Sequence, residues 1–180
     1  MIYVLLVLAV LVVFVIGVYN GLVALKNKCD ESWSNIDTNL KKRYDLIPNL
    51  VETVKGYAAH ESETLENVVK ARNMAINASS VQEQQQAENM LSSSLKSIFA
   101  LAESYPDLKA NQNFIDLQNT LKNVEENIQD SRELYNGVVR DFNTKIEVFP
   151  NNFLANMFNF TKREFFEINK EERENVKVSF

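Results

Sequence analysis

The only histidine of the chain stands in the sequence His60-Glu61-Ser62-Glu63, which resembles the start of a zinc-protease helix. Such a helix carries a second histidine four residues after the first, because both rings must face the same ion, but here that position is Thr64. The single cysteine, Cys29, lies far away in the sequence, so one chain cannot assemble a zinc or iron site from the usual ligands. We therefore expect no metal and no other cofactor, and we interpret His60 as a surface or capping residue at a helix junction.

Other catalytic arrangements are equally hard to find. The serines Ser92, Ser93 and Ser94 have no histidine nearby in the sequence, and no Gly-x-Ser-x-Gly motif occurs. The four glycines never cluster, so a glycine-rich phosphate cradle is not expected. The sequence favours a protein without catalytic residues and without a small-molecule substrate. A hydrolase with an all-carboxylate metal site is an alternative, although the acidic residues mostly fall on outward faces.

Pro48 interrupts a helical pattern of apolar residues, and two polar residues lie close to it. A proline has no N–H to donate to the carbonyl four residues earlier, here that of Tyr44, and this costs a straight helix roughly 3 kcal/mol. Because the apolar pattern continues in phase beyond Pro48, we expect a kink there and not a helix end. Asp45 and Asn49 are the polar neighbours of the carbonyl that is left free.

Polar side chains also occur within two other apolar patterns. Arg72 occupies a core position, where a guanidinium group is costly to bury unless it is paired. Tyr135-Asn136 places a hydroxyl and an amide on a long predicted helix. We expect these groups and those near Pro48 to satisfy one another and to fix the register of the helices. A recognition site for a peptide or a lipid headgroup is the alternative.

The elements that carry these residues begin with a membrane segment. Residues 2–19 contain no charged side chain, and as a helix they span about 27 Å, close to the thickness of the hydrocarbon core of a bilayer. The apolar character continues to Leu25, before Lys26. A cleaved signal peptide would have a basic N-terminal region and an Ala-x-Ala-like cleavage site, and neither occurs here. A lipoprotein would have small and aliphatic residues before its cysteine, whereas Cys29 follows Asn27-Lys28. We expect an uncleaved transmembrane anchor over residues 1–25, with residues 2–25 in contact with lipid.

Charges near this segment indicate its orientation. Five basic residues follow the segment within about 20 positions, whereas only the amino terminus precedes it, so the positive-inside rule predicts a cytoplasmic body. They are Lys26, Lys28, Lys41, Lys42 and Arg43. Gly17 and Gly21 are spaced as in helices that pack closely within membranes, which makes them candidate interface residues. Two glycines in an apolar helix are also common without such a contact.

Apolar residues recur at steps of three and four along the first part of the body, which is the spacing of one helical face. They are Trp33, Ile36, Leu40, Tyr44, Ile47, Val51, Val54 and Ala58. The pattern predicts a helical stretch over about 30–77, with Gly56 as its weak point and a second register after His60.

Two further stretches are predicted over about 82–104 and 107–147. Tyr105-Pro106 separates them, because a residue before proline avoids the helical region, and Asp107 is placed to cap the second. The long second stretch keeps a period near 3.5, which requires packing at a shallow angle against neighbouring helices. The predicted fold class is all-α: an N-terminal transmembrane helix, followed in residues 26–180 by an antiparallel up-down bundle of long helices.

The tail after Phe149-Pro150 is unusually rich in large apolar side chains. They are Phe153, Met157, Phe158, Phe160, Phe165 and Phe166. These rings either plug the open end of the bundle or form an exposed patch for a partner or the bilayer surface. We therefore treat Phe153, Phe158, Phe160, Phe165 and Phe166 as candidate interface residues.

Several of these motifs together resemble the LemA family over almost the whole chain. The run from Leu40 to Val51, LKKRYDLIPNLV, is the strongest match, and it contains Asp45, Leu46, Ile47, Pro48, Asn49 and Leu50. Further matches are His60-Glu61, Ala71-Arg72, Tyr105-Pro106, Tyr135-Asn136 and Phe149-Pro150-Asn151. At Lys41 to Tyr44 the chain departs from the paired arginines and small residue that are frequent in the family. The resemblance implies a bacterial membrane-anchored helical bundle, with no catalytic residues to carry over.

The leading hypothesis is a membrane-anchored scaffold or adaptor of the bacterial inner membrane, which forms a homo-oligomer or binds another membrane protein. The net charge of −5 lies entirely after residue 25, and an acidic surface of mixed sign argues against a nucleic-acid partner. A lipid-surface binder that remodels membranes through its aromatic tail is the alternative from a different class.

Overall fold

The structure, a computed structural model, describes residues 1–166, which form helices and, within that range, no strand. The helices are α1 (Ile2–Lys55), α2 (Ser62–Ile76), α3 (Val81–Ala102), α4 (Pro106–Lys109), α5 (Gln112–Glu147) and α6 (Asn151–Met157). The all-α prediction is confirmed. The end of the predicted 26–180 domain, residues 167–180, lies outside the described residues.

The first long helix has different bounds from those that the apolar pattern predicted. α1 runs without interruption from the membrane segment through Pro48 to Lys55, so the anchor and the first stretch of the body are one helix. The predicted stretch over 30–77 is in turn divided, because a turn from Gly56 to Glu61 separates α1 from α2. Glycine has a low helix propensity, and the chain leaves the helix at Gly56, its expected weak point.

The long helix α5 also begins later than predicted. Asp107 does not cap it, because Pro106 first starts the short helix α4, in whose first turn the missing proline N–H costs nothing. Asn111 takes the capping role instead: its side-chain oxygen accepts a hydrogen bond of 3.0 Å from the backbone N–H of Phe114. The chain therefore turns once more before α5 than the sequence pattern indicates.

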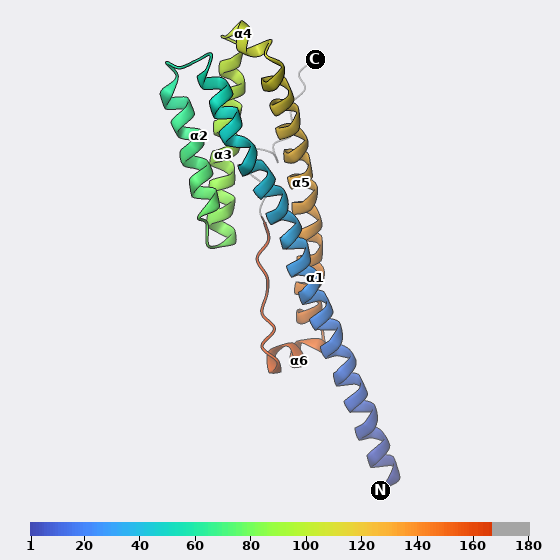
Figure 1. The fold of residues 1–180 in the computed structure, drawn as a ribbon. Helices are drawn as coiled ribbons and strands as arrows, with labels where there is room; N and C mark the ends of the chain where they lie inside the picture. Colours follow the sequence, from blue (N-terminus) through green and yellow to red (C-terminus); the bar gives the residue numbers. More distant parts are fainter. Residues whose placement is uncertain (167–180) are drawn as a thin grey trace, which may run out of the picture. The chain divides into compact units, whose positions relative to one another are not determined.

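The described chain divides into two compact units. The anchor unit comprises Met1–Ile36 and Asp130–Phe165, and the bundle unit comprises Asp37–Gln129 together with Phe166. In the bundle unit α2 and α3 lie side by side as a helical hairpin (Figure 1). Its core consists of fully buried apolar residues from every helix of the unit, among them Ile47, Leu50, Val54, Val68, Leu91, Ile98, Leu108 and Phe114.

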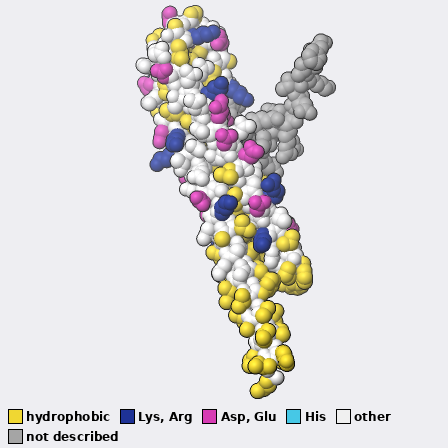
Figure 2. All heavy atoms as spheres, turned by 90° about the vertical axis from the view of Figure 1, so that its right-hand side faces the viewer, with side chains coloured by type: hydrophobic (Ala, Val, Ile, Leu, Met, Phe, Trp, Pro, Cys, Tyr) yellow, Lys and Arg dark blue, Asp and Glu magenta, His cyan; other side chains and the backbone are white. Residues whose placement is uncertain are grey.

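The N-terminal part of α1 is an exposed apolar cylinder. Apolar side chains cover it without a charge, and charged side chains begin only farther along the chain (Figure 2). α1 is the one helix among the described residues that is long and apolar enough to cross a membrane, and none of its most apolar 18-residue window is buried. An apolar helix surface that no protein covers is suited to lipid, which makes this a membrane protein.

The rest of the anchor unit is built from α5, α6 and the segment that follows α6. Asn159 has a φ of +57°, and the N–H of Phe160 donates to the carbonyl of Ala155 (2.9 Å), which ends α6 and reverses the chain. The following segment then runs back beside α5 (Figure 1): Asn143 exchanges two hydrogen bonds of 2.9 Å with the backbone of Arg163.

The aromatic rings of the tail do not share one environment. Phe166 is buried and Phe160 is partly buried, whereas Phe153, Phe158 and Phe165 are 67%, 40% and 45% exposed. Neither of the two alternatives, a buried plug or an exposed patch, therefore describes the whole tail.

Candidate functional site

The most unusual feature of the bundle unit is a buried arginine on α1. Arg43 is 1% exposed, although a guanidinium group is among the groups most costly to remove from water. Its Nη1 donates to Glu125 Oε2 of α5 at 2.5 Å, and its Nη2 donates to Ser92 Oγ of α3 at 2.7 Å. Its Nη1 also lies 3.4 Å from Oε2 of Glu88, which is equally buried. One side chain thus joins three helices.

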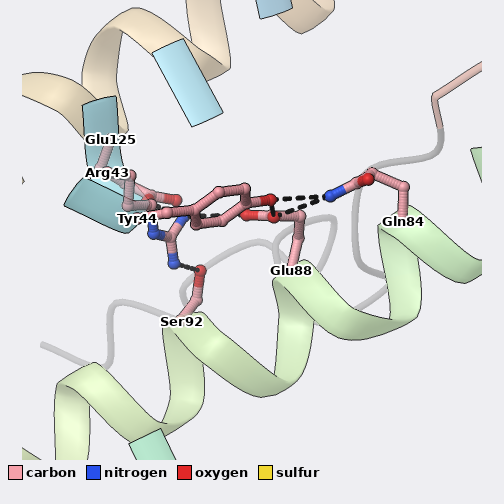
Figure 3. A network of polar contacts seen from close by, with 6 residues as sticks. All are labelled: Arg43, Tyr44, Gln84, Glu88, Ser92 and Glu125. Carbon is pink, nitrogen blue, oxygen red and sulfur yellow. Dashed lines mark hydrogen bonds and ion pairs between the residues drawn. The ribbon is translucent and has the colours of Figure 1, made fainter. Parts of the chain in front are cut away.

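Tyr44 and Gln84 complete this network on the side of Glu88 (Figure 3). The phenol of Tyr44 donates to Glu88 Oε1, and the amide of Gln84 donates to the same carboxylate oxygen (3.0 Å) and to the phenol oxygen (2.8 Å). The carboxylate therefore accepts two hydrogen bonds and faces one cation. We define these six residues, Arg43, Tyr44, Gln84, Glu88, Ser92 and Glu125, as the polar network.

The polar network is suited to fixing helix register. Its charges face one another, and a buried ion pair often adds little net stability over apolar residues of similar volume, so we infer that its role is to fix the register of the helices it joins. Among residues 1–166 no group of three or more histidine, cysteine and acidic side chains is placed to hold a metal ion. The arrangement can position α1, α3 and α5 relative to one another.

Ionisation of Tyr44 should lower the free energy of unfolding at alkaline pH. Burial, followed by the charge of Glu88, raises the pKa of the Tyr44 phenol above its usual range. The unfolded chain begins to release this proton near pH 10 whereas the folded chain retains it, so the stabilisation is complete below pH 10 and is lost as the pH rises further. Above pH 10, the free energy of unfolding of the wild type should fall by about 1.4 kcal/mol more per pH unit than that of Tyr44→Phe. Urea unfolding from pH 8 to 11 measures this, and parallel curves would contradict it.

A second polar contact involves the backbone of Tyr44 itself, at the carbonyl that Pro48 leaves free. Arg72 of α2 donates from Nε to the backbone oxygen of Tyr44 at 2.8 Å. This is the oxygen that the N–H of residue 48 would bind in an uninterrupted helix. Arg72 thus supplies the missing donor, whereas Asp45 and Asn49 are exposed and take no part in this bond.

The other motif residues of the bundle unit lie in α1, in the α1–α2 turn and at the start of α4. His60 is exposed in that turn, and Glu61 accepts a hydrogen bond of 3.0 Å from the hydroxyl of Tyr105. Pro106 then begins α4. Ile47 and Leu50 are buried core residues and Leu46 is half-buried.

The remaining predicted residues lie in the anchor unit. Tyr135 packs its ring on Trp33, with centroids 5.3 Å apart, and donates its hydroxyl to the carbonyl of Glu164 at 3.0 Å. Asn136 is half-buried on the same helix. At Gly17 and Gly21 an added Cβ would meet no atom within 4 Å, so both face open space.

An apolar groove lies between α1 and α2 on the bundle unit. Its volume is about 680 Å³. Val51, Leu65, Val69 and Met74 supply its apolar lining, and Lys55, Glu66 and Lys70 supply its charges. We call this surface the α1–α2 groove.

The sequence patterns missed the polar network, although they contain part of its signal. Arg43 continues the spacing of the buried residues Ile36, Leu40, Ile47 and Leu50. Glu88 likewise lies three residues before the buried Leu91. A charged residue within an apolar register is the signal that would have found both.

Comparison with known proteins gives a consistent set of relatives. A family model described as the LemA family matches residues 32–180. Protein LemA of Metamycoplasma hominis is 26% identical over 168 residues, which cover 91% of this chain and 75% of that protein. Magnetosome protein MamQ 2 of Paramagnetospirillum magneticum is 23% identical over 175 residues, which cover 83% of this chain and 64% of that protein. Magnetosome protein MamQ of Magnetospirillum gryphiswaldense is 21% identical, with 82% and 64% covered. The chain thus spans less than two thirds of the MamQ proteins.

Proposed function

The chain belongs to the LemA family, and on that premise we propose that it is a non-enzymatic scaffold of the bacterial inner membrane that binds another membrane protein through the α1–α2 groove. The observation that carries this proposal is the groove itself, an apolar surface on a helical unit whose helix α1 is also the membrane anchor. A partner held there is tied to the bilayer without any further element.

The groove favours a helical segment as its occupant. Two helices form its walls, and an amphipathic helix places its apolar face in a groove of this kind. Val69 and Met74 are 39% and 43% exposed, and methionine adapts its shape to different partners. Lys55 and Lys70 outnumber Glu66 among the charged lining residues, which favours an occupant with acidic flanks.

The polar network supports this role because a binding groove must keep its shape. Arg43 and Glu88 join α1 to α3, and Arg72 joins α2 to α1 at Tyr44. Both walls of the groove are thereby held by polar contacts of defined geometry, which limits the entropy that binding must overcome. The basic residues that follow the anchor favour a cytoplasmic position for this unit.

Val69→Glu is expected to release the partner. A carboxylate in the groove must be desolvated on binding, and we expect at least a tenfold loss of the associated protein. The full chain is extracted in mild detergent, its native mass is measured and every polypeptide in the particle is identified. Met90→Glu, at an exposed apolar residue of α3 outside the groove, is the matched control and should retain the partner.

Three outcomes are decisive. One identified membrane protein in fixed ratio, lost in Val69→Glu and kept in Met90→Glu, supports the proposal. A particle with a multiple of the chain's own mass contradicts binding to a different protein and makes a second copy the occupant. A single chain without any partner contradicts the scaffold function.

A further inference from the structure

We infer that α6 is a second membrane contact, which lies in the boundary between lipid headgroups and acyl chains beside the transmembrane part of α1. The inference concerns the anchor unit alone and goes beyond the proposed scaffold function. It rests on the depth at which α6 is held, on the side chains that it exposes, and on the charges that bound it.

The depth of α6 follows from its contact with Tyr19. Residues 2–19 span about 27 Å as a helix, so Tyr19 lies where the hydrocarbon core ends, and tyrosine is enriched at that level. The ring of Phe158, at the end of α6, lies 4.8 Å from that of Tyr19, and the ring of Phe160 lies 6.0 Å from it (centroid distances). Within the anchor unit α6 is therefore fixed beside the end of the transmembrane segment (Figure 1).

The exposed face of α6 is apolar. Phe153 and Met157 are four residues apart in α6, the spacing of one helical face, and are 67% and 60% exposed. Phe149, which precedes α6, is 78% exposed, and its ring lies 6.0 Å from that of Phe153 (centroid distance). The opposite face carries Asn151 and Ala155, which are both buried against the unit. An outward face of this composition is unfavourable in water and suited to a bilayer interface.

Charges delimit the same region. No charged residue occurs from Val148 to Thr161, and an ion pair between Glu147 and Lys162 closes this run on both sides. On α1 the uncharged sequence extends to Leu25 before Lys26. Both uncharged surfaces belong to one unit, and Figure 2 shows the apolar surface gathered at the N-terminal part of α1 with charged side chains beyond it. Because the face of α6 continues a surface that already requires lipid, the bilayer and not a protein is its occupant.

Quenching by brominated lipid tests the position of α6 directly. A single tryptophan is placed on the exposed face of α6 by Phe153→Trp in a Trp33→Phe background, and the full chain is reconstituted in phosphatidylcholine vesicles with acyl chains brominated near the headgroup. Leu134→Trp in the same background is the control: Leu134 is 55% exposed on α5 of the same unit. Leu134 lines the same hollow as Lys28. Lys28 lies nine residues after Tyr19, or about 14 Å farther along α1, so Leu134 is held outside the hydrocarbon core.

We expect brominated lipid to lower the fluorescence of the Phe153→Trp variant at least twofold and to leave that of the Leu134→Trp variant nearly unchanged. Met157→Trp provides a second position on the same face, should Phe153→Trp fail to reconstitute as a helical protein. Equal quenching of the α6 variants and the Leu134→Trp control, or no quenching at either position of the α6 face, would overturn the inference.

Discussion

Arg43→Met is expected to lower the free energy of unfolding by about 3–5 kcal/mol, because it leaves the buried carboxylate of Glu88 without its cation. Methionine fills much of the volume of the arginine stem, so the loss reports the charge and not a cavity. Glu125 is 45% exposed and can be rehydrated, which places most of the cost at Glu88. Urea unfolding of the detergent-solubilised chain, followed by circular dichroism, measures this effect.

Two companion variants separate the buried charge from other effects. Lys42→Met removes an exposed cation next to Arg43, and it should change stability by no more than about 0.5 kcal/mol. The double variant Arg43→Met/Glu88→Leu removes both charges, and it should recover most of the loss, since apolar replacements of buried pairs are often neutral. A loss below about 1 kcal/mol for Arg43→Met, or no recovery in the double variant, would contradict a buried pair.

The sequence predicted the helices because the spacing that marks a helix is a local property of the chain. It also predicted the exposed part of α1, since the run of uncharged residues before Lys26 has no counterpart elsewhere in the sequence. The beginning of α5 was not predicted correctly. Asp107 and Asn111 are both good capping residues, and the choice between them depends on how α4 packs around the buried Leu108.

The polar network depends on contacts that no local pattern contains. Arg43 and Tyr44 are adjacent in α1, and the spacing of one buried helical face fits either of them, so the sequence pattern does not decide whether Arg43 is buried. The carboxylates of Glu88 in α3 and Glu125 in α5 offset the cost of removing the Arg43 guanidinium from water, and both residues are distant from Arg43 in the sequence. The same reason applies to α6: the sequence marks its rings as candidate interface residues, but their depth at the membrane follows only from the contact of Phe158 with Tyr19.

The pairing of Arg72 with the carbonyl of Tyr44 leads to the second large effect. Arg72→Met leaves that oxygen without its donor, and we expect a loss of about 1–3 kcal/mol in the free energy of unfolding. Lys70→Met, at an exposed residue of the same helix, is the matched control and should cost no more than about 0.5 kcal/mol.

Pro48→Ala tests the cause of that loss, because alanine restores the N–H that can donate to Tyr44 O within α1. Pro48 is exposed in a helix that continues on both sides, so alanine fits there without strain. In the Pro48→Ala background Arg72→Met should therefore cost at least about 1 kcal/mol less than in the wild type, a coupling that a double-mutant cycle measures. If the two substitutions are additive, Arg72 stabilises the bundle through its packing alone. If they are coupled, Pro48 and Arg72 act together. The carbonyl of Tyr44, which Pro48 leaves without its intrahelical hydrogen bond, then accepts the hydrogen bond that holds α2 against α1.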